Sequence, residues 1–163
     1  MNKQLTAILP MLRRFAYSLT GSMANADDLV QSTIEKILSK GIPDEADLTK
    51  WAFRLCRNVW IDEYRANKVR QAATQNPELQ EQPQYDQEKY IETNDALQQV
   101  NQAMSTLPDD QRAVLSFVAV QGMSYKQVSA TLDIPVGTVM SRLSRARTAL
   151  IGLIGHLSAG ATT

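Results

Sequence analysis

SYKQVSATLDIPVGTVMSRLSRARTAL, residues 124–150, is the stretch that decides the fold. It has the pattern of two short helices joined by a sharp turn. Ser124 can cap the first helix, and Gln127 follows three residues later, which is the spacing of a capping box. Val128 and Leu132 recur at helical spacing and give this helix one apolar side. We therefore expect a short amphipathic helix directly after Ser124.

A turn containing a proline leads into the second helix. Pro135 disfavours helical angles at Ile134 and suits the start of a new helix. The second helix has an apolar stripe formed by Val139, Leu143, Ala146 and Leu150. Its other faces carry small polar residues and arginines, namely Thr138, Ser141, Arg142, Arg145 and Arg147. No acidic residue lies between positions 136 and 150, so this helix is expected to be amphipathic and basic.

This layout is typical of a helix-turn-helix, whose second helix enters the major groove of DNA by its N-terminal turns. Thr138 and Ser141 come first, where bases are read, and the arginines follow, where phosphates flank the groove. The alternative is an ordinary helical hairpin with a solvated basic face. The spacing favours DNA binding, but it does not exclude the alternative of an ordinary helical hairpin.

The segment also resembles the C-terminal DNA-binding module of bacterial extracytoplasmic-function (ECF) sigma factors, the smallest promoter-specificity subunits of RNA polymerase. The resemblance rests on IPVGTV-x-SRL-x-RAR within residues 124–150. It implies that the five polar and basic residues given above contact the minus-thirty-five element. Two positions depart from the family pattern. Asp133 replaces a usual turn glycine, although Asp tolerates left-handed angles better than most residues, and Met140 replaces a common lysine.

Charge is unevenly distributed along a chain whose net charge is zero. Residues 1–70 carry 11 Lys/Arg against 8 Asp/Glu, residues 71–95 carry 1 against 6, and residues 96–163 carry 5 against 3. Two mildly basic blocks therefore flank an acidic strip. A net charge of zero would by itself argue against non-specific nucleic-acid binding. The separation of charge into basic and acidic blocks removes that argument.

Cysteine and hydropathy patterns indicate a soluble, cytoplasmic protein. Cys56 is the only cysteine, which excludes an internal disulfide and suits a reducing compartment. It lies among apolar helical positions, so a buried structural thiol is favoured over a redox sensor. No apolar run is long enough for a membrane span, and no signal peptide is recognised. His156 stands alone, so we expect no metal site and no cofactor.

The N-terminal block, residues 1–70, has the pattern of three or four helices. The first is expected from about residue 9 to Gly21, with Leu12, Phe15 and Leu19 at helical spacing. The second, residues 24–41, has an apolar side of Leu29, Val30, Ile34, Ile37 and Leu38. Asp27 and Asp28 are expected in its first turn, where the helix dipole favours acids.

The third element, residues 48–70, is a basic helix with aromatic residues. Its expected core side consists of Trp51, Leu55, Val59 and Tyr64, with Trp60 also assigned to packing. Its basic residues are Arg54, Arg57, Arg65, Lys68 and Arg70. Asn58 and Asp62 are neighbours one turn apart. Such a helix suits single-stranded DNA, and a solvated amphipathic helix is the alternative.

Two segments of this block also resemble ECF sigma factors. DDLVQ-x-T resembles the surface that grips the coiled coil of the largest polymerase subunit, which implies polymerase contacts by Asp27, Asp28, Leu29 and Gln31. W-x-F-R-L-x-R-N-x-x-x-D-x-x-R resembles the promoter-melting helix, which implies minus-ten contacts by Arg54, Arg57, Asn58, Asp62 and Arg65. The loop 41–47 would then form the pocket for a flipped base.

Residues 71–95 are rich in glutamine and acid, contain two prolines and lack a sustained apolar period. They are expected to form a flexible linker between two domains. A plain tether is sufficient to explain this composition. The resemblance implies a further role, since linkers of this family thread through the RNA channel of the polymerase.

Residues 96–155 are expected to form a module of four helices that ends in the helix-turn-helix. Leu97, Val100, Met104 and Leu107 are in helical register before Pro108, and a further helix runs from there toward Gly122. The segment L-P-x-x-Q-R-x-V-L again resembles the family. The small, polar tail, residues 156–163, is expected to be disordered.

The sequence therefore predicts an all-α protein of two small helical domains, and the resemblance implies an ECF-type sigma factor that is not an enzyme. Its implied partners are core RNA polymerase, promoter DNA and an anti-sigma factor. No small-molecule substrate and no direct membrane insertion are expected. Two alternatives remain. One is a stand-alone helix-turn-helix regulator, and the other is a sigma mimic that sequesters an anti-sigma factor.

Overall fold

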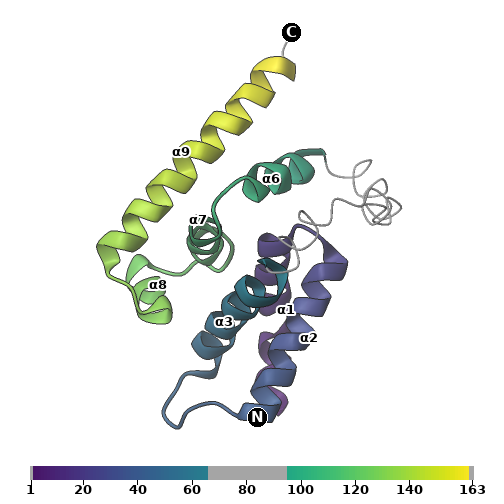
Figure 1. Cartoon of the computed structure of the whole chain (residues 1–163), viewed down its shortest axis with the longest axis vertical. Coiled ribbons are helices and arrows are strands. Elements are labelled where there is room, and N and C mark those ends of the chain that lie inside the picture. Colours follow the sequence, from purple (N-terminus) through teal and green to yellow (C-terminus); the bar gives the residue numbers. More distant parts are fainter. Residues whose placement is uncertain (1, 66–94, 162–163) are drawn as a thin grey trace.

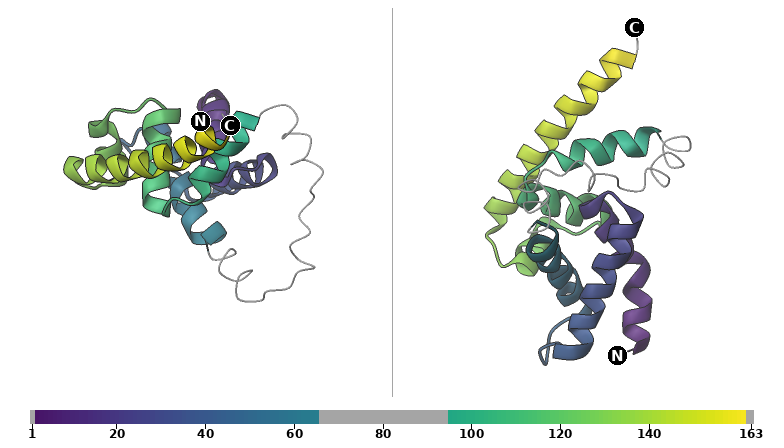
Figure 2. Two further views of the ribbon diagram at one scale, coloured as in Figure 1. Left: turned by 90° about the horizontal axis from the view of Figure 1, so that it is seen from above. Right: turned by 45° about the vertical axis from the view of Figure 1, so that its right-hand side comes forward.

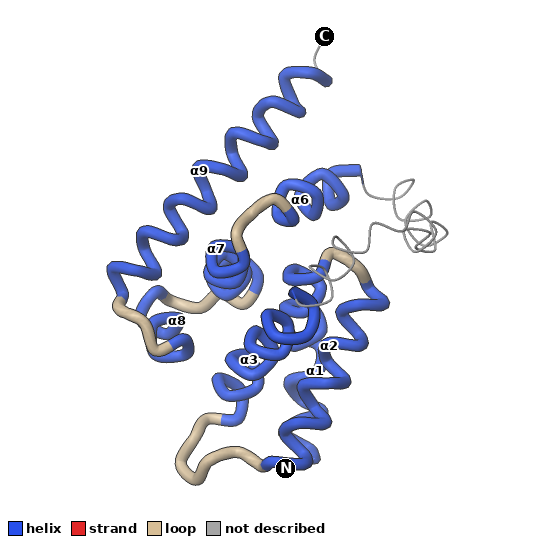
Figure 3. The backbone as a smooth tube through the Cα atoms, viewed as in Figure 1, coloured by secondary structure: helices blue, strands red, loops and turns tan. Residues whose placement is uncertain are grey.

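The computed structural model describes residues 2–65 and 95–161, and every regular element in those ranges is a helix (Figure 3). The N-terminal half contains α1 (Asn2–Thr20), α2 (Met23–Lys40), α3 (Leu48–Val59) and the π-helical segment η1 (Trp60–Arg65). The C-terminal half contains α6 (Asp95–Ser105), α7 (Asp109–Leu115), the π-helical segment η3 (Ser116–Val120), α8 (Tyr125–Leu132) and α9 (Val136–Ala161). The all-α prediction is confirmed. Residues 66–94, which include nearly all of the predicted linker, lie outside the described residues.

Helix α1 begins earlier than predicted because its N-terminal turns also contribute to the core. Leu5 and Ile8 are only 5% and 6% exposed. Pro10 lies inside this helix, where it removes one backbone hydrogen bond. Burial of an aliphatic side chain is worth about 1.5–3 kcal/mol, which offsets that loss. The helix ends as predicted at Gly21, whose φ of 73° favours glycine.

Helix α2 starts at Met23, and its N-terminus is capped by Ser22. The Ser22 hydroxyl accepts a hydrogen bond from the Asn25 N–H at 3.3 Å. Asp27 and Asp28 therefore lie in the second turn, and the prediction that they occupy the first turn is wrong. Because the helix dipole acts mainly on the terminal turn, it stabilises these two acids less than expected.

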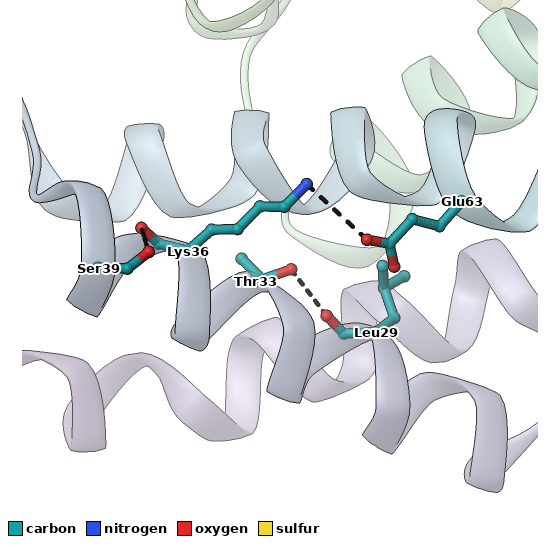
Figure 4. A network of polar contacts seen from close by, with 5 residues as sticks. All are labelled: Leu29, Thr33, Lys36, Ser39 and Glu63. Atoms are coloured by element: carbon teal, nitrogen blue, oxygen red, sulfur yellow. Dashed lines mark hydrogen bonds and ion pairs between the residues drawn. The ribbon is translucent and has the colours of Figure 1, made fainter.

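The core side of α2 differs from the predicted stripe at one end. Its buried side chains are Ala26, Leu29, Val30, Thr33 and Ile37. The assignment of Leu38 to this side is wrong, since Leu38 is 58% exposed. The Thr33 hydroxyl donates to the Leu29 carbonyl at 2.8 Å, so a polar group is accommodated in the core (Figure 4). Lys36 Nζ lies 3.8 Å from Glu63 Oε1 and links α2 to η1 (Figure 4).

Helix α3 presents a partly different side to the core than the spacing predicted, although Val59 is buried as expected. Its buried side chains are Leu48, Ala52, Phe53, Cys56 and Val59. Trp51 and Leu55, which were expected on that side, are only half-buried. Trp60 packs as predicted and is 8% exposed. Apolar residues occur on more than one face of this helix, so periodicity alone did not determine which face is buried.

The two halves share one hydrophobic core. Phe117 of η3 stacks on Phe15 of α1, with ring centroids 4.5 Å apart, and meets Phe53 of α3 edge-on at 6.4 Å. Figures 1 and 2 show α7 and η3 placed between α9 and the bundle of α1–α3. Segments about a hundred positions apart in the sequence are thus packed side by side.

Polar contacts also join the halves around this aromatic cluster. The Arg112 guanidinium donates through Nε to the Ser18 carbonyl at 2.9 Å, and Gln121 Nε2 donates to the Met11 carbonyl at 3.0 Å. Arg112 is 6% exposed. Burial lowers the pKa of Arg112 to about 10, an effect that the charge of Asp109 partly opposes. The side chain therefore remains charged at neutral pH and binds the C-terminal end of α1.

The C-terminal end of the chain differs from the prediction. Helix α9 continues to Ala161 and extends beyond the other helices, so residues 156–161 are helical where disorder was expected (Figure 1). No proline interrupts this segment. Gly155 and Gly160 each cost about 1 kcal/mol relative to alanine, which weakens a helix without ending it.

The single cysteine is buried, as predicted, and we expect it to be unreactive in the folded protein. Cys56 is 0% exposed, and burial raises the pKa of its thiol to about 12, an effect that a hydrogen bond with Thr33 partly opposes. A disulfide reagent such as DTNB should modify the native protein at least about a hundredfold more slowly than the denatured protein. Equal rates in the two states would show that the thiol is accessible.

The same pKa shift gives a pH dependence with a defined sign. The folded-state pKa lies above the usual value of 9.0, so the folded state retains the proton to higher pH than the unfolded chain. The stability contributed by the neutral thiol is complete below pH 9.0 and declines as pH rises toward 12. Replacing Cys56 with serine should remove this component from the alkaline unfolding profile.

Candidate nucleic-acid interface

The predicted helix-turn-helix is formed by α8 and α9, and its local determinants act as expected. Ser124 Oγ accepts from the Gln127 N–H at 3.1 Å, and Gln127 Oε1 accepts from the Ser124 N–H at 2.9 Å, which completes the capping box. Asp133 adopts the left-handed conformation, with φ 55° and ψ 50°. The Ile134 N–H then donates to the Ser129 carbonyl at 3.1 Å and closes the turn. These bonds fix the angle at which α9 leaves α8.

Four of the five predicted groove-facing residues share one face of α9. Its buried stripe is Val139, Leu143 and Ala146, which are 0%, 2% and 0% exposed. The shared face consists of Thr138, Ser141, Arg142 and Arg145, which recur three or four positions apart. Arg147 is exposed but comes about two and a half turns after Thr138, so it lies on the opposite side of the helix.

The predicted minus-ten residues lie on α3 and η1. Arg54, Arg57 and Asn58 are half-buried, and Asp62 is exposed. Arg57 Nη1 donates to Asn58 Oδ1 at 3.0 Å, which fixes the orientation of the amide. Arg65 is the last residue of η1, and its side chain lies outside the described residues. A π-helical segment, which is rare and often found at functional sites, begins two residues after Asn58.

Some of the predicted minus-ten residues line a cleft of about 700 Å³ between the two halves of the chain. It is lined by Arg57, Asn58, Ile61 and Asp62 from one half and by Pro108, Asp109 and Asp110 from the other. Asp110 also forms an ion pair with Arg142 of α9, with Nε and Oδ2 3.3 Å apart. The sequence did not indicate this meeting of α3, α7 and α9, since the two aspartates had a sufficient local explanation at the start of a helix.

The electrostatics of Arg57 reflect the same arrangement. Burial lowers the pKa of Arg57 below its usual range, and the nearby positive charge of Arg142 lowers it further. Asp110 acts in the opposite direction and favours the charged form. Arg57 Nε is buried and has no hydrogen-bond partner among the described residues. The two arginines from different halves therefore face a common carboxylate.

The predicted polymerase surface is a short patch on α2. Asp27, Asp28 and Gln31 are exposed, and Asp27 Oδ1 lies 3.1 Å from Arg13 Nε of α1. Leu29 is 0% exposed, so its side chain belongs to the core and can only support the patch from below.

Within residues 2–65 and 95–161, no group of His, Cys, Asp or Glu side chains has an arrangement that could hold a metal ion. In the same part of the chain, no helix combines the length and apolar character needed to cross a membrane.

Two protein families match this chain, one in each half of the fold. The family described as Sigma-70, region 4 matches residues 97–150, which contain α8 and all of the groove-facing residues of α9. The family described as the Sigma2 domain of PhyR matches residues 5–56, which contain most of α1, all of α2 and most of α3.

Solved structures resemble nearly the whole chain. The sigma factor RpoE from Bartonella quintana, solved in complex with the anti-sigma factor NepR, is 28% identical with a TM-score of 0.69, covering 94% of this chain and 96% of that one. The anti-anti-sigma factor PhyR from the same organism, complexed with NepR, is 18% identical with a TM-score of 0.64. It covers 94% of this chain and 50% of PhyR, and at that identity the likeness concerns the fold alone.

Sequence relatives extend over most of the chain as well. The ECF RNA polymerase sigma factor EcfG of Rhodopseudomonas palustris is 35% identical over 153 residues, which cover 91% of this chain and 81% of the relative. The helix-turn-helix and the helical N-terminal bundle are consistent with this sequence similarity. The chain therefore belongs to the extracytoplasmic-function family of RNA polymerase sigma factors.

Proposed function

We propose that this protein directs core RNA polymerase to promoters by reading the minus-thirty-five element with α9 and melting the minus-ten element with α3 and η1. The observation that supports this most is the polar face of α9, because α9 follows the capped helix α8 across a closed turn and this face has no acidic residue. Thr138 and Ser141 can hydrogen-bond base edges at the groove floor. Arg142 and Arg145 are long enough to contact guanine or the flanking phosphates.

The minus-ten role rests on the pairing of Arg57 with Asn58. An arginine can contact backbone phosphate, and an amide held in place by a neighbour can hydrogen-bond an unpaired base edge. Because Arg57 holds the Asn58 oxygen at 3.0 Å, the amide NH₂ is left to donate to a base. Trp60 is buried, which supports its packing role over direct insertion into DNA.

The polymerase contact is assigned to Asp27, Asp28 and Gln31 on α2, with Leu29 as their support. Exchanging both aspartates for lysine should weaken binding to core polymerase by at least about tenfold, because a surface complementary to two carboxylates would repel two ammonium groups. The measurement is a titration of fluorescently labelled protein with core enzyme. Since both side chains are exposed, the helical circular dichroism signal should be unchanged.

A matched control exists for this charge reversal. Asp44 and Glu45 are exposed acids in the loop 41–47, and their exchange for lysine changes the net charge equally. If the two double variants bind core polymerase with equal affinity, the assigned surface is not the contact.

An anti-sigma factor is a further proposed partner, because the similar RpoE was solved in complex with one. A protein that only mimics a sigma factor is the second candidate function, supported by the match of residues 5–56 to the Sigma2 domain of PhyR. A mimic has no need of DNA-reading side chains, whereas Arg57, Asn58, Arg142 and Arg145 are all present here. Their presence favours the sigma factor.

Transcription with purified core polymerase on a pool of promoter fragments tests the proposed function. A sigma factor should yield transcripts from a defined subset that shares two spaced elements. The absence of transcripts from every fragment, together with firm binding to an anti-sigma factor, would identify a mimic. The division of the chain into an N-terminal domain (1–70), a linker (71–95) and a C-terminal domain (96–155) remains a prediction.

A further inference from the structure

Two exposed apolar side chains lie at the beginning of α9. Val136 is 39% exposed and Met140 is 52% exposed, so neither belongs to the buried stripe of this helix. They are four positions apart, and residues at that spacing are neighbours on a helix surface. A single exposed apolar residue is ordinary, but these two adjoin each other on the helix that is proposed to enter the DNA groove.

Gly137 lies between these two residues and leaves the backbone bare. It is part of α9, its φ is not positive, and a Cβ added to it would meet no atom within 4 Å. Neither packing nor a left-handed backbone therefore requires glycine here, and alanine would favour the helix more. A position without a side chain does allow a ligand to approach the backbone closely. Together with Val136 and Met140, Gly137 forms an apolar patch.

The apolar patch continues directly into the residues assigned to base reading. Ser141 is exposed and lies four positions after Gly137, so it borders the patch on the helix surface. The patch and Ser141 fall within the first two turns of α9, which is the part of a recognition helix that contacts base edges. The patch is therefore continuous with the proposed DNA-reading face.

The chemistry of the apolar patch selects one feature of the major groove. None of its side chains carries a charge or a hydrogen-bond donor, and the Met140 thioether is only a weak acceptor. The patch therefore offers little to a phosphate or to a polar base edge. The 5-methyl group of thymine is the apolar substituent exposed in this groove, and apolar side chains recognise it by contact. Methionine is flexible and polarizable, which suits such a contact.

We propose that the apolar patch contacts the 5-methyl group of one thymine in the minus-thirty-five element, which makes Met140 a determinant of promoter specificity. This rests on the proposed function, because it adds a contact to the helix assigned to that element. The methyl group lies against Val136 and Met140 and approaches the backbone at Gly137. The neighbouring base edge is then within reach of Ser141.

Removal of the methyl group from the DNA tests this contact. The probe is a fluorescent duplex carrying the upstream element of a fragment that the holoenzyme transcribes, with each thymine of either strand replaced in turn by deoxyuridine. One replacement should weaken holoenzyme binding about three- to fivefold, which is the effect of losing one buried methyl group. The other replacements should change the affinity by less than about twofold. No loss at any thymine would overturn the proposal.

Variants at position 140 assign the lost affinity to the methionine side chain. With Met140→Ala, the difference between thymine and uracil should shrink to less than about twofold, as in a double-mutant cycle for two groups in contact. Met140→Leu should retain the difference, because it keeps an apolar side chain of similar volume. Met23→Ala on α2 removes a methionine that is 45% exposed and should leave the difference unchanged. A methyl effect of wild-type size in Met140→Ala would mean that Met140 does not make the contact.

Gly137→Ala provides a readout that a purely structural role would not produce. The added Cβ meets no atom of the protein, so the melting temperature should be equal to or above that of the wild type. The affinity for the thymine duplex should nevertheless fall at least about threefold, because the Cβ occupies the space assigned to the thymine methyl group. An unchanged affinity would show that DNA does not approach this part of the helix closely, which contradicts the proposal.

Three outcomes separate this proposal from the proposed function and from a protein contact. If the holoenzyme transcribes no fragment of the promoter pool, the proposed function fails and the methyl contact fails with it. If it transcribes and Arg145→Ala weakens minus-thirty-five binding, but uracil has no effect, the methyl contact is wrong and groove reading by α9 stands. If Met140→Ala weakens binding to core polymerase while the methyl effect persists, the apolar patch contacts protein and the proposal is wrong.

Discussion

Replacing Phe117 with alanine is expected to lower the free energy of unfolding by about 3–5 kcal/mol, the usual cost of removing a buried phenyl ring. Phe117 is 0% exposed and contacts Phe15 and Phe53, both of which belong to the other half of the chain. The substitution leaves a cavity and removes two aromatic contacts at once. Urea denaturation followed by circular dichroism measures the change.

The matched control for this prediction is Ile151→Ala on α9. Ile151 is 71% exposed, so its substitution should change the free energy of unfolding by less than about 0.5 kcal/mol. Because Phe117 belongs to a core shared by both halves, the wild type should unfold in a single transition. A loss below about 1 kcal/mol for Phe117→Ala would mean that the aromatic junction does not contribute to stability in solution.

Arg145→Ala is expected to weaken binding of the holoenzyme to a minus-thirty-five element by about 1–3 kcal/mol if Arg145 contacts a base. If it contacts a phosphate, the dependence of affinity on salt should instead become weaker. The negative slope of log affinity against log salt concentration should decrease in magnitude by about one. Arg145 is exposed on the same face as Thr138 and Ser141. It tests that face more cleanly than Arg142, whose substitution would also remove the ion pair with Asp110.

The comparison for this prediction is Arg14→Ala on α1, which removes the same charge from an exposed position in the other half. The Arg14→Ala substitution should change neither the affinity nor the salt dependence of minus-thirty-five binding. Identical behaviour of the two variants would mean that α9 does not read the element. Affinities are measured by fluorescence anisotropy over a series of salt concentrations.

The helix-turn-helix could be predicted from the sequence almost residue by residue because its determinants are local. The capping box joins residues three positions apart, and Asp133 adopts its left-handed turn from its own conformational tolerance. The stripe of Val139, Leu143 and Ala146 repeats at helical spacing, so the buried side followed directly. Each of these features depends on neighbours within about two turns.

The N-terminal bundle was predicted less accurately because several helix faces are apolar there. On α3, Trp51 and Leu55 had the correct spacing, yet Ala52 and Phe53 occupy the core. The choice depends on which face meets α1 and α2, and periodicity does not contain that information. The first helix was expected from about residue 9, whereas burial of the preceding turns extends α1 back to Asn2, with Pro10 inside it.

The long-range contacts around the cleft could not be predicted, since no local pattern connects the residues that form them. Asp110 and Arg142 are neighbours only because α7 and α9 pack together, and Arg57 reaches them from α3. The aspartates at the start of α7 also stabilise the N-terminus of that helix, which is a sufficient reason for their presence. The ion pair of Asp110 with Arg142 becomes visible only when the tertiary arrangement is known.

Promoter opening by the holoenzyme tests the central claim most directly. With core polymerase, the protein should make thymines around minus ten reactive to permanganate, whereas the free protein should not, because unstacking costs a few kcal/mol per base. Asn58→Ala should reduce this reactivity more than it reduces duplex binding, since Asn58 lies on α3 and not on the groove-reading helix. Tight dimeric binding to a palindrome without polymerase, or no opening at any promoter, would contradict the account.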